Sequence, residues 1–127
     1  MTKEDYEKLV PIFKESGIMI ITDEIYAELS YEHKFCSIAS FDEIKDQVIL
    51  VSGFSKAYAM TGWRVGFAVG EPEIISGMAK IISQTTSNLT SVSQYAAIEA
   101  LTGDQSSIEE MRKAFEERLN TIYPLLA

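Results

Sequence analysis

Lys56 is the residue of this chain whose type and position most clearly indicate chemistry. It follows the apolar run 48–51 and the small-residue turn Ser52-Gly53. Four consecutive aliphatic residues bounded by polar and glycine residues are typical of a buried strand. Ligands of open α/β sheets bind at the carboxyl ends of the strands, so Lys56 lies where a reactive group is expected. To act there, its amine needs a pKa lowered by burial and by neighbouring positive charge.

Other ionisable side chains occupy comparable places. Arg64 stands eight residues after the lysine, next to Trp63, and a second apolar run, 18–21, leads to Asp23 and Tyr26. Two predicted buried strands therefore each deliver ionisable residues at their C-terminal ends. Each residue alone has a simpler interpretation. Asp23 and Tyr26 can merely end a strand, Arg64 can be a surface arginine, and the tryptophan can belong to the core.

Three motifs occur in order along the chain: Asp23-Glu24-Ile25-Tyr26, then Gly53-Phe54-Ser55-Lys56, then Gly62-Trp63-Arg64-Val65-Gly66. This constellation resembles the fold-type I pyridoxal-phosphate enzymes, and more closely the class I/II aminotransferases of the aspartate aminotransferase family. The resemblance covers nearly the whole chain. Each motif alone is a weak pattern, whereas the ordered set with its lysine-to-arginine spacing is a strong signal.

The resemblance implies pyridoxal 5′-phosphate (PLP) as cofactor and a role for each matching residue. Lys56 would form the internal aldimine and shuttle the substrate α-proton. Asp23 would keep the pyridine nitrogen protonated, which makes the ring an electron sink. Tyr26 would hydrogen-bond the ring 3′-oxygen. Arg64 would clamp the cofactor phosphate with two parallel charge-assisted bonds, and Ser55 would add a hydroxyl donor.

Gly53 departs from the pattern of many relatives, which carry a serine at this position as a further phosphate ligand. Ser52 is adjacent, but successive side chains of a strand point to opposite faces, so it is not expected to replace that ligand. The sequence therefore predicts a phosphate-binding site that is weakened by one missing ligand but still present.

Composition limits the other classes of function. With a net charge of −8, neither nucleic acid nor an anionic membrane is an expected partner. No apolar run approaches the roughly 20 residues of a membrane span, and the first ten residues are charged and polar. The single cysteine, Cys36, fits a reducing compartment, and a cytoplasmic location is expected. His33 lies in a polar turn and is expected to be exposed, so no metal site is predicted.

The resemblance also bears on domain organisation. Enzymes of the family are about three times longer, so residues 1–127 are expected to form part of the PLP-binding large domain. The expected fold class is α/β: a three-layer piece of the fold-type I large domain, with a mostly parallel sheet and flanking helices. Residues 107–123 would form the long helix that leads toward a small domain absent from this sequence, which would leave an apolar helix face exposed. The full-length protein is expected to be a homodimer.

Local signals predict where the helices begin and end. Thr2 and Asp5 can form a capping box, Gly17 suits a helix C-terminus, and Pro72 suits a first helical position. Pro11 predicts a kink or a broken turn. Residues 65–69 are predicted to form a return strand, which runs antiparallel in the family.

Two later helices carry further predictions. One would be capped by Ser91 or Ser93, and the other would begin with a capping box at 107–110 and end at Pro124. The first of these helices is expected to turn these residues inward: Val92, Tyr95, Ala96, Ile98 and Leu101.

Three functions remain open at this point. The first is an aminotransferase that moves an amino group from an amino acid to a 2-oxo acid. The second is a carbon–sulfur β-lyase on the same scaffold, which would use the same lysine, aspartate and arginine. The third is a non-catalytic folded module that does not retain PLP, because the glycine-rich turn that normally completes the phosphate site is missing from this sequence.

Overall fold

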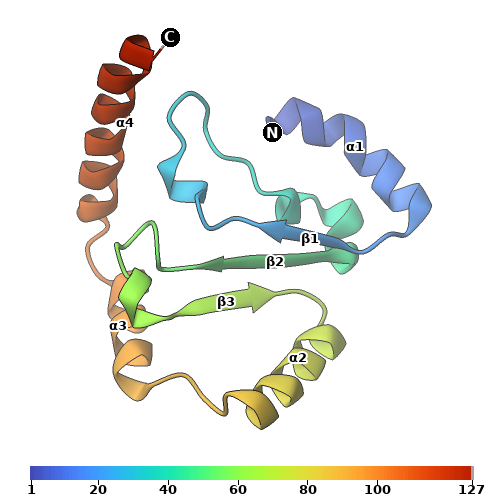
Figure 1. The fold of residues 1–127 in the computed structure, drawn as a ribbon. Coiled ribbons are helices and arrows are strands. Elements are labelled where there is room, and N and C mark those ends of the chain that lie inside the picture. The colour runs from blue at the N-terminus through green and yellow to red at the C-terminus, as the bar shows by residue number, and fades with distance from the viewer. Residues whose placement is uncertain (127) are drawn as a thin grey trace.

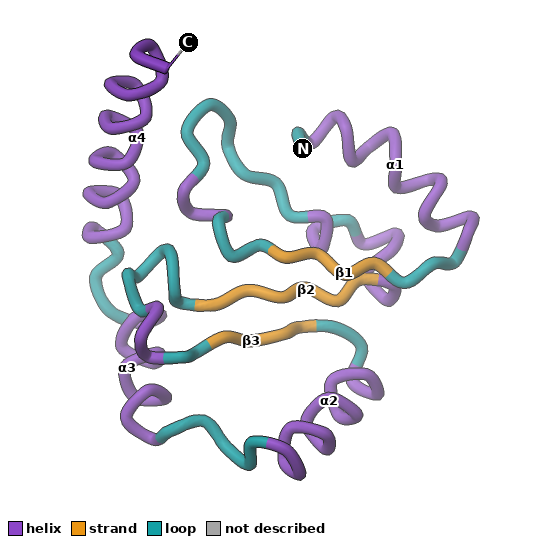
Figure 2. The backbone as a smooth tube through the Cα atoms, viewed as in Figure 1, coloured by secondary structure: helices purple, strands orange, loops and turns teal. Residues whose placement is uncertain are grey.

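The computed structural model describes residues 1–126, which form a three-stranded sheet flanked by helices (Figure 1). β1 (Ile20–Asp23) and β2 (Val48–Gly53) run parallel, and β3 (Gly66–Val69) returns antiparallel to β2, in the order β1-β2-β3. The carboxyl ends of β1 and β2 therefore meet at one edge of the sheet, beside the start of β3. Long connections leave the strands at this edge (Figure 2). The α/β class and the antiparallel return strand are confirmed.

One core lies between α1 (Lys3–Ser16) and the connection from β1 to β2. Its buried residues are Val10, Ile38, Ile44 and Val48. The connection folds here into two short 3₁₀ helices, η2 (Ile38–Ser40) and η3 (Asp42–Gln47). α1 begins with the predicted capping box, because the Thr2 and Asp5 side chains each accept a hydrogen bond from the other residue's backbone N–H.

A second core supports the turn that carries Lys56. Phe54, Met60 and Val65 are buried against Ala97 of α3 (Ser91–Thr102). Phe54 accepts, through its backbone oxygen, bonds from the N–H groups of Tyr58 and Met60, at 3.2 and 3.3 Å. The segment after β2 is therefore a tight turn wound around one buried aromatic side chain.

The prediction of which α3 residues point into the core is wrong for most of them. Val92, Tyr95, Ile98 and Leu101 are 56–75% exposed, and Ser93 and Ala97 are buried instead. The partly buried Ala96 and Ala100 pack on the same core as Ala97. A face of small side chains lets the helix backbone approach the Lys56 turn closely, which large apolar residues would prevent.

The strand β1 is also less buried than its apolar run predicted. The run 18–21 precedes and overlaps the strand, and Ile18, Met19 and Ile21 are 49%, 50% and 72% exposed. β1 lies at the edge of the three-stranded sheet, so no neighbouring strand covers its outer side in the part of the chain described.

Two predictions of helix ends are corrected, both in α4. α4 (Ser106–Leu126) continues past Pro124, which was expected to end it, and α1 likewise contains Pro11 without a break. Residues 7 and 120, whose carbonyl groups lose a partner at these prolines, are exposed, so water can replace the missing N–H donor. α4 begins at Ser106, not at a capping box on 107–110. Asp104 accepts hydrogen bonds from the N–H and the hydroxyl of Ser106.

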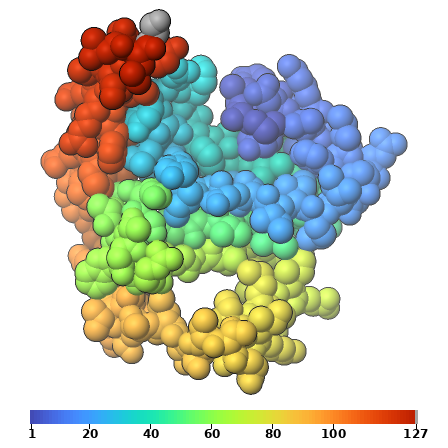
Figure 3. Space-filling view, in the orientation of Figure 1, coloured from blue at the N-terminus to red at the C-terminus, as the bar shows by residue number. Residues whose placement is uncertain are grey.

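α2 (Pro72–Thr85) begins at its proline as predicted and has no buried residue. In Figure 3 an opening separates the yellow segment that contains α2 from the orange segment that contains α3. The expected exposed face of α4 is present: Leu119, Ile122 and Tyr123 are 41–69% exposed. Within residues 1–126, no helix combines the length and the apolar character that crossing a bilayer requires.

Candidate active site

The cavity beside Lys56 is built at the edge where β1 and β2 end. It has a volume of about 610 Å³ and contains Tyr26, Ser55 and Lys56 in its lining. The Lys56 Nζ atom lies 5.7 Å from the centre of the Tyr26 ring, a cation–π distance. The remaining walls come from the loop after β1, the Lys56 turn and α4: Leu29, Tyr31, Ala59, Thr61, Met111 and Phe115. Leu29 and Tyr31 of the loop after β1 therefore face this cavity.

A second cleft adjoins the first. It has a volume of about 230 Å³ and is lined by Ser52, Gly53, Ser55 and Arg64, together with Ile25, Val65 and Gly66. Ser55 lines both spaces and is therefore common to the cavity of Lys56 and the cleft of Arg64. The sequence spacing between the lysine and the arginine thus places these residues on two neighbouring hollows that share Ser55.

Arg64 has an uncommon backbone conformation. Its φ and ψ angles of 55° and 47° place it in the left-handed region, which costs a residue with a side chain roughly 1–2 kcal/mol. Its Nη1 donates a hydrogen bond of 3.1 Å to the Thr61 carbonyl, and the Thr61 hydroxyl donates one of 3.0 Å to the Ser55 carbonyl. Thr61 therefore links the arginine to the turn that carries Ser55. Strained backbone of this kind is concentrated at functional sites.

Asp23 ends β1 and lies opposite Val51 in the parallel ladder, at the same edge as the other predicted residues. Its side chain is exposed and accepts a 3.1 Å hydrogen bond from the N–H of Ile25. It lines neither of the two hollows described above. The structure thus brings Tyr26, Ser55, Lys56 and Arg64 together directly and places Asp23 next to them through the strand pairing.

Glu24 was not singled out by the sequence, although it is buried beside Asp23. Its carboxylate accepts hydrogen bonds from the hydroxyls of Ser37, at 2.6 Å, and Thr22, at 3.3 Å, while its carbonyl accepts one of 3.3 Å from Ser52. Glu24 therefore ties the long loop after β1 to the strand. The only sequence signal was its place in the Asp23 motif, since its Ser37 partner lies in an irregular connection.

The missing serine at position 53 has a steric explanation. A Cβ atom on Gly53 would lie 2.9 Å from the Val65 carbonyl oxygen and 3.0 Å from the Gly66 Cα atom. Both contacts are with backbone of the paired strand and its approach, where β2 and β3 come close. The close pairing of β2 and β3 therefore favours glycine at position 53. The hydroxyl of the neighbouring Ser52 is bonded to Glu24, as described.

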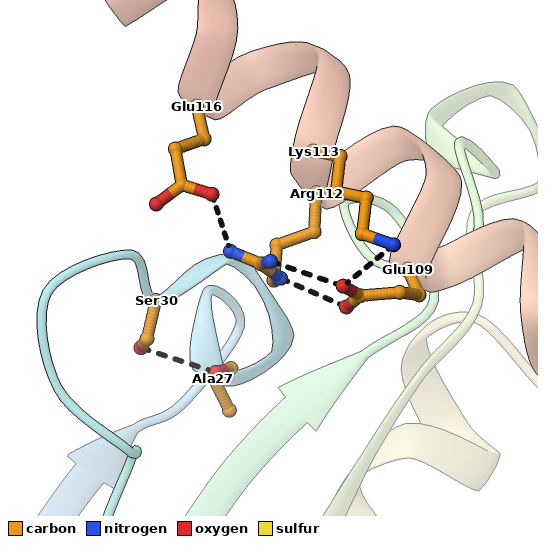
Figure 4. A network of polar contacts seen from close by, with 6 residues as sticks. All are labelled: Ala27, Ser30, Glu109, Arg112, Lys113 and Glu116. Atoms are coloured by element: carbon orange, nitrogen blue, oxygen red, sulfur yellow. Dashed lines mark hydrogen bonds and ion pairs between the residues drawn. The ribbon is translucent and has the colours of Figure 1, made fainter. Parts of the chain in front are cut away.

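α4 contributes a charged network beside the larger cavity (Figure 4). Arg112 donates to Glu109 from Nε and Nη2, at 2.8 and 3.0 Å, and to Glu116 from Nη1, at 2.9 Å. These two carboxylates raise the pKa of the Arg112 guanidinium, chiefly through the hydrogen bond with Glu109. Arg112 does not line the larger cavity, and Lys56 is the only cationic residue that does so in the described part of the chain.

The donor set fits a small molecule that carries an aldehyde and a phosphate. Lys56 lines one hollow together with Ser55, and Arg64 lines the other, again together with Ser55. Guanidinium and hydroxyl groups are the usual ligands of a phosphate, and a lysine amine is the usual partner of an aldehyde. Among residues 1–126, the structure contains no group of three or more side chains suited to hold a metal ion.

Comparison with known proteins agrees with the resemblance drawn from the three motifs. The sequence profile of the family "Aminotransferase class I and II" matches residues 1–127. The chain belongs to this family. The chain is 55% identical over 128 residues to an asparagine–oxo-acid transaminase of Streptococcus mutans, and 52% identical over 130 residues to an aspartate aminotransferase of Bacillus sp. strain YM-2. Each match covers 99% of this chain and 33% of the relative, so the chain spans about a third of the length of these class I and II enzymes.

Solved structures of the family share the fold. The structure of an aromatic aminotransferase from Pyrococcus horikoshii OT3 superposes with a TM-score of 0.93 at 35% sequence identity, over 98% of this chain and 34% of that one. The resemblance drawn from the three motifs is therefore confirmed at the level of family and fold. The roles of the individual site residues stay predictions.

Proposed function

We propose that this chain forms the cofactor-binding part of a PLP-dependent aminotransferase, which moves an amino group from an amino acid to a 2-oxo acid. The observation that carries the proposal is the pair of adjoining hollows, one lined by Lys56 and the other by Arg64, with Ser55 in both linings. The amine and the two groups that we assign to the phosphate thus come from one continuous segment, residues 55–64. The names of the two sequence relatives favour transfer of an amino group over carbon–sulfur cleavage.

Each residue has a distinct task in this proposal. Arg64 and Ser55 would bind the cofactor phosphate and fix its position. The Lys56 amine would hold the cofactor aldehyde and would move the proton at the α-carbon of the substrate. Tyr26, which lines the same cavity, would donate its phenolic O–H to the cofactor 3′-oxygen, and Asp23 would keep a proton at the pyridine nitrogen. PLP supplies an electron sink for the pair of electrons that the α-carbon retains.

A reductive-trapping experiment tests the central residue. The purified chain is incubated with PLP, its visible absorbance is recorded, and borohydride then reduces the bond between amine and aldehyde for peptide mapping by mass spectrometry. We expect a visible band and modification at Lys56. Lys56→Ala should abolish both, whereas Lys80→Ala should change neither, because Lys80 is an exposed lysine on α2. A band that persists unchanged in Lys56→Ala would refute the assignment of Lys56.

A product assay separates transferase from lyase. The full-length protein is given an amino-acid/2-oxo-acid pair in one reaction and cystathionine in another. Exchange of the amino group is expected in the first reaction, and release of pyruvate and ammonia from cystathionine would instead favour the β-lyase. The predicted homodimer and the predicted cytoplasmic location remain part of the proposal.

A further inference from the structure

Ser93 is a buried polar residue on the first turn of α3, and only 5% of it is exposed. Its hydroxyl donates a 2.8 Å hydrogen bond to the carbonyl oxygen of Trp63 and accepts one of 2.7 Å from the Thr90 hydroxyl. Neither hydroxyl caps the helix, because α3 has no side-chain hydrogen bond at its N-cap, Thr90. The predicted capping role of Ser93 is therefore wrong, and its hydroxyl is directed at another segment.

The Trp63 carbonyl belongs to the peptide group that joins Trp63 to Arg64. A hydrogen bond that holds this carbonyl also holds the plane of the peptide group. The orientation of the Arg64 backbone N–H is set by the same plane. Arg64 needs such support because its φ of 55° lies in the left-handed region that residues with a side chain disfavour. The next residue, Val65, is buried in the core that also contains Ala97 of α3. In Figure 1 the short helix before β3 lies against α3.

We propose that Ser93 is a positioning residue that holds the peptide before Arg64, so that the guanidinium stays on the cleft that it shares with Ser55. The chain of bonds runs from the Thr90 hydroxyl to Ser93, then to the Trp63 carbonyl, and ends at the strained arginine. This inference rests on the proposed function, because it assumes that Arg64 binds the phosphate of PLP. Ser93 touches no part of the cofactor site itself: it lines neither hollow.

Binding measurements with two probes test the inference. PLP and pyridoxal, which lacks the phosphate, are titrated into the chain and followed by absorbance. Ser93→Ala keeps the packing but removes the hydroxyl, and it should weaken PLP binding about 3- to 10-fold, as expected for one lost hydrogen bond, while pyridoxal binding stays unchanged. Thr90→Val should act in the same direction with a smaller effect. Ser91→Ala, at an exposed serine of the same turn, is the matched control and should change neither.

A double variant shows whether Ser93 acts through Arg64. Ser93→Ala combined with Arg64→Ala should bind PLP no more weakly than Arg64→Ala alone, because the arginine that Ser93 positions is then absent. Additive losses, or an equal loss of PLP and pyridoxal in Ser93→Ala, would overturn the inference. If Arg64→Ala weakens both probes equally, the phosphate role of Arg64 in the proposed function is what fails.

A third measurement does not depend on cofactor. Trp63 is the only tryptophan of the chain and is 44% exposed, so acrylamide quenching of its fluorescence reports on this segment. Quenching should increase in Ser93→Ala and remain unchanged in Ser91→Ala. Unchanged quenching in Ser93→Ala would refute the positioning role whatever the binding data show.

Discussion

The close approach of β2 and β3 at Gly53 makes a prediction whose size follows from the structure. Replacing Gly53 with alanine adds a Cβ atom 2.9 Å from the Val65 carbonyl oxygen, where ordinary contact begins at 3.4 Å. The strands must therefore separate by about half an ångström. Since the obstructing atoms are backbone atoms, no side-chain rotation can relieve the contact.

The cost of this separation is that of local overpacking, about 1–3 kcal/mol. The same Val65 oxygen accepts the hydrogen bond from the N–H of Phe54, which is already long at 3.4 Å, so the movement weakens that bond as well. Reduced freedom of the unfolded chain returns roughly 0.4–1 kcal/mol. The expected net loss in the free energy of unfolding is about 1–2 kcal/mol, and Gly53→Ser should suffer the same loss because it adds the same Cβ atom.

Urea unfolding followed by circular dichroism measures this loss, as a shift of the midpoint by about 1 M to lower urea for a typical slope. Gly62→Ala is the matched control, because a Cβ atom there has no neighbour within 4 Å and should leave the midpoint unchanged or slightly higher. If Gly53→Ala unfolds at the same urea concentration as Gly62→Ala, the steric explanation for glycine at position 53 is refuted.

Two further predictions concern a buried and an exposed carboxylate. Glu24→Ala leaves the Ser37 hydroxyl without its 2.6 Å acceptor and should lower the free energy of unfolding by about 1–3 kcal/mol. Glu24→Gln keeps an acceptor oxygen and should lower it clearly less. Equal losses of the two variants in urea unfolding would argue against this hydrogen bond. The hydroxyl and N–H of Ser106 lower the pKa of the Asp104 carboxyl, the hydroxyl contributing most. The stabilisation that this gives the start of α4 is therefore present above the ordinary carboxyl pKa and is lost as the pH falls below about 4. Amide exchange in the first turn of α4 should become faster over that pH range. Asp104→Asn should remove this pH dependence.

The parts of the fold that the sequence predicts are those set by local chemistry. Thr2 and Asp5 cap α1, Gly17 takes the left-handed conformation at its end, and Pro72 opens α2. In each case the signal and its structural consequence lie within a few residues. The two apolar runs before Asp23 and Lys56 likewise indicated strands, and parallel pairing then brought their carboxyl ends to one edge.

One prediction that failed, and one contact that the sequence does not reveal, depend on distant segments of the chain. The apolar spacing of α3 indicated that Val92 and Tyr95 face inward, but the helix packs through its small residues against Phe54, Met60 and Val65. The bond between Glu24 and Ser37 joins residues 13 apart across an irregular loop, where no periodic pattern exists to reveal it. Both features are decided by tertiary contacts, which local residue type alone does not encode.

The peptide between Trp63 and Arg64 shows how the fold and the site depend on one another. On one side it accepts the hydrogen bond of Ser93 from α3; on the other it leads to Val65, which fills the core under the Lys56 turn. Arg64 stands between these two anchors and adopts a conformation that an unsupported arginine would avoid. Under our proposal, the Ser93 hydroxyl of α3 therefore helps to position Arg64. Removing that hydroxyl should affect Arg64 first, whereas a substitution that loosens the packing of Ala97 should affect both Arg64 and the Lys56 turn, because Phe54 and Val65 share one core with Ala97.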